Sequence, residues 1–216
     1  VDADTGYGNA INVIRTVQEL IRAGAGGMFL EDQIWPKRCG HMASKSCIPA
    51  EEMVQKVKAA VDARRDHDFV IVSRTDAAGP HGVDEAVRRL NLYAEAGADV
   101  MYADALLSKE DIAKVAKHVP KPLMVNMGLG MRPRKTTPLM SPQQLQDIGV
   151  AAVSYPRLLT TAALRGMMNA LDVFQREVVG NNSVVERTDL QVGFEELNDL
   201  MGMKTLDDME RKYTGG

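Results

Sequence analysis

The feature that most constrains the fold is an alternation of short apolar runs with longer segments of helical spacing. Apolar runs fall at residues 26–32, 69–73, 99–104, 123–126 and 150–155, and a shorter one opens the chain at residues 1–4. Amphipathic segments with helical spacing separate them, as at residues 10–23, 50–65 and 83–96, and a long segment at residues 160–177 carries Met and Leu on its expected buried side. Ser108 with Asp111, and Ser141 with Pro142, mark two further helix starts. This order predicts parallel strands joined by crossover helices, the arrangement of an α/β protein.

The predicted strands are fewer than a closed barrel needs, and the positions of the polar side chains, described below, are what favour a barrel. Six strands are predicted, counting the truncated first one, whereas a (β/α)8 TIM-type barrel has eight strands and typically about 250 residues. We therefore expect such a barrel lacking its first two βα units, formed by residues 1–180, with a C-terminal helical extension at residues 181–216. An open doubly wound sheet is the alternative, and periodicity alone does not distinguish the two.

Composition limits the class of partner. The 216 residues are 45% hydrophobic and 25% charged, which is typical of one globular domain with a full core. The net charge of -3 provides no positive field to attract nucleic acid or an anionic membrane, so a small molecule is the expected partner. No apolar run approaches the roughly 20 residues that span a bilayer. The two cysteines, Cys39 and Cys47, share one polar loop, which favours a reducing, cytoplasmic location.

Polar side chains stand at the carboxyl ends of successive predicted strands. They are Asp2 and Asp4, Glu31 and Asp32, Arg74 and Asp76, Asp104, and Asn126. In a β/α barrel these positions converge on one mouth, where active sites lie. A single Asp after a strand is often only a helix cap or a turn residue, but five such strand ends are difficult to explain in that way.

Three of these carboxylates are a candidate metal site. Asp2 and Asp4 are two residues apart on a segment that we expect to be extended, so both would point to the same face, and Glu31 from the neighbouring strand could join them. Oxygen ligands without nearby His or Cys suit Mg²⁺ or Mn²⁺ rather than Zn²⁺. The alternative is that Asp2 and Asp4 cap the helix that starts near Asn9.

The loop after Glu31 carries a candidate reactive thiol. Cys39 is flanked by Lys37, Arg38 and His41, and cationic neighbours lower a thiol pKa and populate the thiolate. A buried, inert cysteine is the usual alternative, but this one does not lie in an apolar run. Cys39, His41 and Cys47 have no familiar zinc-site spacing. The loop is long, polar and contains glycine, as expected of a segment that closes over a substrate.

Four motifs give a specific resemblance. DADTGYGN, LEDQ followed by KRCGH, and SRTDA occur in this order, and the similarity extends over nearly the whole chain, including FEELNDLMG near its end. The chain resembles the isocitrate lyase and phosphoenolpyruvate mutase superfamily, within it the branch of methylisocitrate lyase, 2,3-dimethylmalate lyase, oxaloacetate acetylhydrolase and petal death protein. KRCGH is the most discriminating motif. Mutases and hydrolases of phosphonopyruvate lack that loop, so phosphorus–carbon chemistry is disfavoured.

The resemblance implies a Mg²⁺ site, with Mn²⁺ as a second ion that could serve, at Asp2, Asp4 and Glu31. It implies a catalytic acid/base at Cys39, with Lys37 and His41 in the same loop. It also implies substrate contacts at Gly40, Arg74, Asp104 and Asn126, with Arg74 binding a carboxylate.

The chain departs from the family pattern at two places. Asp104 stands where the family usually has glutamate, and residues 128–138 (GLGMRPRKTTP) replace a shorter segment with its own glutamate. This basic stretch either recognises another anionic group or is a solvated loop, and we slightly favour the loop. The resemblance further implies a homotetramer in which a C-terminal helix is exchanged between subunits.

The expected reaction is cleavage of a carbon–carbon bond in a 2-hydroxy di- or tricarboxylate, similar to methylisocitrate, dimethylmalate or isocitrate, to an α-keto acid and a second carboxylic acid. Hydrolysis or decarboxylation of oxaloacetate in the same site is a first alternative. The second is a degenerate, non-catalytic barrel, which the altered Asp104 and 128–138 positions would favour. The retained DADTG and KRCGH motifs argue against it.

Overall fold

The structure is a computed structural model that describes residues 1–38, 45–64, 68–128 and 137–214. The chain forms two compact units, Val1–Pro156 and Arg157–Gly216. The predicted division after residue 180 stays a prediction. No helix of the described residues combines the length and apolar character needed to cross a membrane.

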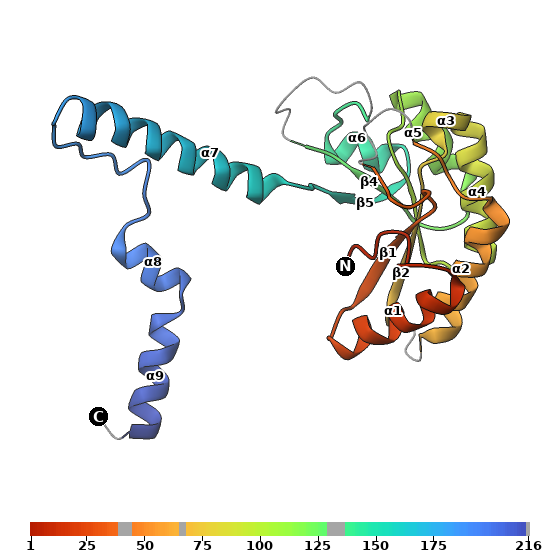
Figure 1. Cartoon of the computed structure of the whole chain (residues 1–216), viewed down its shortest axis with the longest axis horizontal. Helices are drawn as coiled ribbons and strands as arrows, with labels where there is room; N and C mark the ends of the chain where they lie inside the picture. The colour runs from red at the N-terminus through yellow and green to blue at the C-terminus, as the bar shows by residue number, and fades with distance from the viewer. Residues whose placement is uncertain (39–44, 65–67, 129–136, 215–216) are drawn as a thin grey trace. The chain divides into compact units, whose positions relative to one another are not determined.

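A parallel sheet organises the first unit (Figure 1). Its strands are β1 (Gly27–Glu31), β2 (Val70–Thr75), β3 (Val100–Ala103), β4 (Leu123–Asn126) and β5 (Val150–Ser154). They pair in sequence order, each parallel to the next. A doubly wound sheet reverses its strand order at a switch point, so the described strands have the order of a barrel and not that of the alternative.

The expected strand at residues 1–4 is only a single bridge. Asp2 pairs parallel with Phe29, next to β1. The chain then turns, because Asp4 has a positive φ of 50° and the Gly6 amide donates to the Ala3 carbonyl at 2.8 Å. The prediction of an extended Asp2–Asp4 segment is therefore wrong at Asp4.

The described residues of the first unit also form six helices. They are α1 (Ala10–Arg22), α2 (Ala50–Ala63), α3 (Ala78–His81), α4 (Val83–Glu95), α5 (Lys109–His118) and α6 (Pro142–Asp147). Contacts join α1 to α2, α2 to α4 and α4 to α5, so these four helices form one layer. The single-turn α3 has no side-chain cap, which explains why the sequence did not predict it.

Capping side chains set the helix starts. Asn9 accepts from the amides of Ile11 and Asn12 and so caps α1. The alternative in which Asp2 and Asp4 cap this helix is therefore wrong. Ser108 caps α5, and Ser141 forms a capping box with Gln144 at α6, as the sequence predicts.

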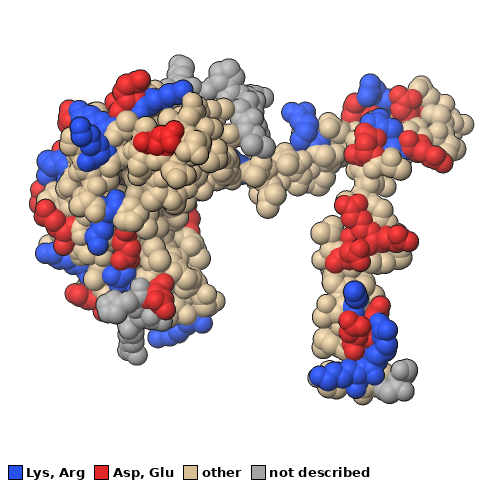
Figure 2. Space-filling model, turned by 180° about the vertical axis from the view of Figure 1, so that it is seen from behind, with Lys and Arg blue, Asp and Glu red and all other residues tan. Residues whose placement is uncertain are grey.

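The core of the first unit lies between the sheet and this helix layer. Fully buried large side chains come from both, among them Met28, Leu30, Met53, Ile71, Leu90, Tyr93 and Met101. In the view of Figure 2, basic and acidic side chains are interspersed over the surface of this unit. The apolar faces that the sequence pattern predicts for residues 50–65 and 83–96 are thus confirmed as core.

The second unit contains α7 (Leu158–Val173), a π-helical continuation η1 (Phe174–Gly180), α8 (Phe194–Leu200) and α9 (Met203–Thr214). Residues 160–177 were expected to bury their Leu and Met side chains. That prediction is wrong for this chain, because α7 contains no buried residue and its large apolar side chains are more than half exposed at Leu164, Met167, Met168 and Leu171. No other described residue of this unit buries these side chains.

A substitution at Gly27 would test how closely the backbones of β1 and β2 approach each other. This glycine stands opposite Val70, and a Cβ at Gly27 would lie 2.5 Å from the Val70 carbonyl oxygen. We expect Gly27→Ala to lower the free energy of unfolding by about 1–3 kcal/mol, since backbone cannot give way as a side chain does. Urea denaturation measures this. Gly26→Ala is the matched control, because a Cβ there meets no atom within 4 Å. Equal effects of the two substitutions would contradict the close pairing.

Candidate active site

The first group of site residues is held by the turn before α1 and by the end of β1. The Glu31 amide donates to the Asp4 carbonyl at 2.9 Å, and the Asp4 amide donates to Asp2 Oδ1 at 2.9 Å. These bonds fix the turn beside the strand. They place Asp2, Asp4 and Glu31 at one edge of the sheet, as the sequence predicts.

The three carboxylates surround the ammonium group of Lys37. Lys37 Nζ lies 2.5 Å from Asp4 Oδ1, 3.4 Å from Asp2 Oδ2 and 3.6 Å from Glu31 Oε2. Burial disfavours the charged ammonium, but the hydrogen bond to Asp4 and the charges of Glu31, Asp2 and Asp4 together raise the pKa of Lys37 above its usual value. The site therefore holds a positive charge between its carboxylates.

The chemistry of these residues fits a hard dication. All three offer carboxylate oxygens, and Glu31 is 2% exposed with Oε1 buried and without a hydrogen-bond partner among the described residues. Burial raises the pKa of Glu31 to about 7, against the opposing charges of Arg74 and Lys37. A dication would favour its ionised form. Within the described ranges, no three Asp, Glu, His or Cys residues are grouped so that they could hold a metal ion, and the Lys37 ammonium lies close to the three carboxylates.

Arg74, on β2, is fixed by carboxylates. Its Nε and Nη2 donate to Asp76 at 2.9 and 3.0 Å, and Nη2 also donates to Asp104 Oδ2 at 2.7 Å. Nε lies 3.4 Å from Glu31 Oε2, and the guanidinium carbon lies 5.6 Å from the centre of the Tyr102 ring. Although burial opposes it, the charges of Asp76, Asp104 and Glu31 raise the pKa of Arg74. Arg74 thus connects Asp104 to Glu31, and through Glu31 to the cluster of three carboxylates.

The other predicted site residues are placed less directly. Asn126 is buried at the end of β4, on the same edge of the sheet, where the Met127 amide donates to the Ser154 carbonyl at 2.8 Å. Cys39, Gly40 and His41 lie outside the described residues. Their predicted roles stay predictions.

The sequence pattern missed the role of Asp32. This carboxylate is fully buried, and four of the hydrogen bonds that it accepts have lengths of 2.7 to 3.0 Å. The donors are the Thr75 hydroxyl, the Asp76 amide, the Arg89 guanidinium and the Tyr93 hydroxyl. Asp32 therefore connects β1, β2 and α4 beneath the site rather than lining its mouth.

The second cysteine belongs to this buried region. Burial, together with the charge of Asp32 and a hydrogen bond to it, raises the pKa of the Cys47 thiol. A raised pKa keeps a thiol protonated and unreactive. Cys47 is therefore not an activated nucleophile in this structure.

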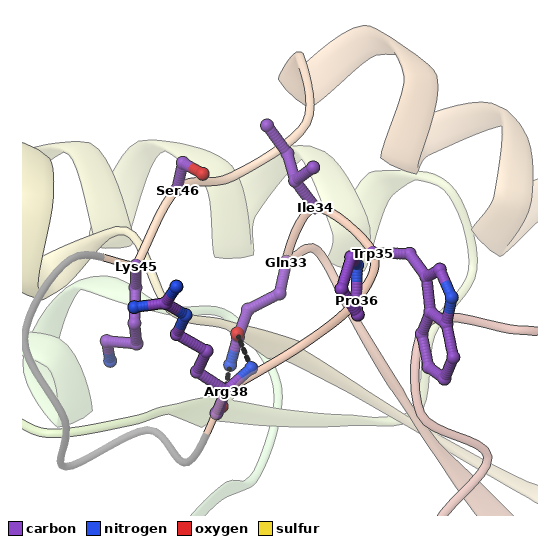
Figure 3. A pocket seen from close by; sticks show the side chains of 7 residues that line it. All are labelled: Gln33, Ile34, Trp35, Pro36, Arg38, Lys45 and Ser46. Atoms are coloured by element: carbon purple, nitrogen blue, oxygen red, sulfur yellow. Dashed lines mark hydrogen bonds between the residues drawn. The ribbon is translucent and has the colours of Figure 1, made fainter.

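Hydrogen bonds connect the two described ends of the loop after β1, residues 33–38 and 45–47 (Figure 3). Gln33 forms an antiparallel bridge with Cys47, and the Ile34 amide donates to the Ser46 carbonyl at 2.9 Å. The Gln33 side chain bonds both backbone groups of Arg38, each at 2.9 Å. A pocket of about 210 Å³ lies between these ends.

A buried ion pair connects the loop to Arg74. Lys45 Nζ lies 2.9 Å from Asp76 Oδ1, and both side chains are almost fully buried. After the opposing effect of burial, Arg74 and then Lys45 lower the pKa of Asp76, by charge and by hydrogen bonding. Asp76 is thus an ionised carboxylate shared by two cations.

Comparison with known proteins identifies the family. The phosphoenolpyruvate phosphomutase family model matches residues 1–174. The chain is 38% identical to petal death protein of Dianthus caryophyllus over 213 residues, 99% of this chain and 64% of that protein. It is 38% identical to 2,3-dimethylmalate lyase of Eubacterium barkeri over 215 residues, 100% of this chain and 72% of that protein. It is 43% identical to 2-methylisocitrate lyase of Aeropyrum pernix over 202 residues, 94% of this chain and 62% of that protein. The chain thus spans less than two thirds of the first and third of these relatives.

Solved structures give the same family. Oxaloacetate acetylhydrolase in complex with 3,3-difluorooxalacetate matches with a TM-score of 0.85 at 30% identity, covering 100% of this chain and 70% of that one. Phosphonopyruvate hydrolase with oxalate and Mg²⁺ matches with a TM-score of 0.78 at 28% identity, covering 99% and 71%. These matches confirm the predicted fold class, a barrel of the (β/α)8 type with appended C-terminal helices. The chain belongs to the phosphoenolpyruvate phosphomutase family, within the phosphoenolpyruvate mutase and isocitrate lyase superfamily.

Proposed function

We propose that this chain is the catalytic part of a Mg²⁺-dependent carbon–carbon lyase. Its substrate is a 2-hydroxy di- or tricarboxylate similar to methylisocitrate, dimethylmalate or isocitrate, which it cleaves to an α-keto acid and a second carboxylic acid. The observation that carries the proposal is the convergence of Asp2, Asp4 and Glu31 on one cation, with Arg74 in contact with Glu31. Relatives named as lyases support it.

Asp2, Asp4 and Glu31 would hold the metal ion, Mg²⁺ or in its place Mn²⁺. When bound, it supplies Lewis-acid polarisation of the substrate's hydroxyl and the adjacent carboxylate. The match to a hydrolase solved with oxalate and Mg²⁺ supports this choice of ion. Lys37 remains a nearby source of positive charge for an anionic substrate.

Arg74 is suited to bind a substrate carboxylate. Asp76 and Asp104 engage Nε and Nη2, which fixes the plane of the guanidinium. Nη1 has no hydrogen-bond partner among the described residues, so its two N–H groups can donate to an anion. We place Asp104, Asn126 and Gly40 around the same substrate.

Cleavage requires two proton transfers: one proton leaves the substrate hydroxyl, and another is delivered to the carbon of the departing fragment. A base removes the hydroxyl proton, the carbon–carbon bond breaks, and its electron pair passes to the departing fragment as an enolate-like carboxylate. Cys39 then donates its thiol proton to the carbon of that fragment. Lys37 and His41, from the same loop, and Arg74 stabilise the negative charge that develops. The roles of Cys39, Gly40 and His41 are carried over from the family motif KRCGH.

Oxaloacetate hydrolysis is the second candidate function, with decarboxylation as a variant. The structural match to oxaloacetate acetylhydrolase favours it specifically. Both reactions would use the same residues, so the products decide between them. A degenerate, non-catalytic barrel is the third candidate, favoured by Asp104 in place of the family's usual glutamate.

The assembly that we propose is a homotetramer with an exchanged C-terminal helix. The exposed Leu and Met side chains of α7 support it, because large apolar faces are normally covered. Sedimentation of the purified protein measures the oligomeric state. The proposed location is the cytoplasm.

One prediction of this function concerns the reaction. We expect release of an α-keto acid from at least one of methylisocitrate, dimethylmalate and isocitrate, and loss of that activity with EDTA or in Cys39→Ser. Coupled dehydrogenase assays measure the keto acid. Oxalate and acetate formed only from oxaloacetate would instead identify the hydrolase. If the folded chain binds Mn²⁺ but turns over none of the four compounds, the enzyme proposal is wrong and the non-catalytic barrel stands.

Another prediction of this function concerns Arg74. Arg74→Gln should lower kcat/KM roughly 100-fold, chiefly through KM, because a buried cation that pairs with the substrate carboxylate is lost. Arg88→Gln is the matched control, since Arg88 pairs with Glu85 on the exposed side of α4 and should change kcat/KM by less than about twofold. A loss confined to kcat would contradict the role of Arg74 in binding.

A further inference from the structure

We infer that Gln33 is a positioning residue, whose side-chain amide fixes the backbone of Arg38 and thereby holds the Lys37 ammonium among Asp2, Asp4 and Glu31. The inference rests on the proposed function, which places Lys37 in the catalytic site. Gln33 is not among the residues proposed above to bind the metal ion or the substrate. The sequence analysis treated Gln33 only as part of the LEDQ motif.

The contact itself is a two-bond clamp. Gln33 Nε2 donates to the Arg38 carbonyl at 2.9 Å, and Gln33 Oε1 accepts from the Arg38 amide at 2.9 Å. Figure 3 shows both bonds between the same two residues. One bond would fix a distance, whereas two bonds to the N–H and C=O of one residue also fix the orientation of its backbone.

The clamp has a rigid base. Gln33 is 2% exposed and its backbone bridges to Cys47. Asp32, the preceding residue, is held by four donors and its carbonyl accepts from the Ile48 amide at 2.9 Å. Because Gln33 follows the anchored Asp32 and is itself bridged to Cys47, its side-chain amide has a fixed position from which to hold Arg38.

The effect reaches Lys37 through the chain. Lys37 directly precedes Arg38, and its ammonium contacts three carboxylates while its side chain remains 25% exposed. A lysine side chain loses rotamer entropy when its ammonium is held in one place, and a fixed backbone lowers that cost. Without the clamp, the same side chain can reach solvent.

Chemical labelling tests this without turnover. Acetylation by a hydroxysuccinimide ester, followed by mass spectrometry, reports the rate at each lysine. We expect Lys37 to react roughly tenfold faster in Gln33→Met, which loses both bonds. Gln33→Glu, which can still accept from the Arg38 amide, should fall between that variant and the wild type. The exposed Lys109 and Lys121 normalise the rates.

Two controls separate positioning from general destabilisation. Gln144→Met removes a comparable hydrogen bond, from the Ser141 amide to the Gln144 side chain, at a site distant in sequence from Lys37. It should leave the acetylation rate of Lys37 unchanged. Lys56, 5% exposed and bonded to the Thr5 carbonyl, reports loss of the fold. Equal acceleration at Lys56 and Lys37 in both Gln33 variants would mean that Gln33 is merely structural. No acceleration at Lys37 in a folded Gln33→Met chain would also overturn the inference.

Kinetics then separate this inference from the proposed function. In an active enzyme, Gln33→Met and Lys37→Met should each lower kcat/KM, and the double variant should lose less than about twofold beyond Lys37→Met alone. Full additivity would show that Gln33 acts independently of Lys37 and would contradict the inference. If the wild type has no activity, the proposed function fails, whereas the labelling still decides whether Gln33 positions Lys37.

Discussion

The arrangement of the site depends on the buried carboxylate of Asp32. An ionised group without access to water is tolerated only where donors and an opposite charge surround it. Thr75, Asp76, Arg89 and Tyr93 provide them, from β2 and α4. Removal of any one partner would leave the others around an incompletely satisfied charge, so the ends of β1 and β2 and one face of α4 are held as a unit.

A chain of polar contacts extends from this carboxylate to the site. Asp32 fixes the backbone of Asp76, and the Asp76 side chain then orients Arg74 and binds Lys45. Arg74 in turn contacts Asp104 and Glu31. Side chains from three strand ends are therefore ordered before any substrate arrives, as expected of a site whose electrostatics are preorganised.

The sequence predicted those parts of the fold that depend on local pattern. Alternating apolar runs gave the parallel strands, and Ser108 and Ser141 gave two helix starts. The turn at Asp4 was missed because nothing in DADTG indicates a left-handed residue before the glycine. The Asp32 network was missed because Arg89 and Tyr93 lie 57 and 61 residues away and resemble ordinary positions of an amphipathic helix. The exposure of α7 was missed because a periodic apolar face does not specify what covers it.

The sequential order of the strands has a consequence for how the chain folds. Each of the strands β1 to β4 hydrogen-bonds to the one that follows it, so every new pairing needs only the next βα unit to be present. Such short sequence separations favour rapid folding, since little loop entropy is lost at each step. The sheet can therefore grow one unit at a time during synthesis on the ribosome, with β1 ordered before β5 has been translated.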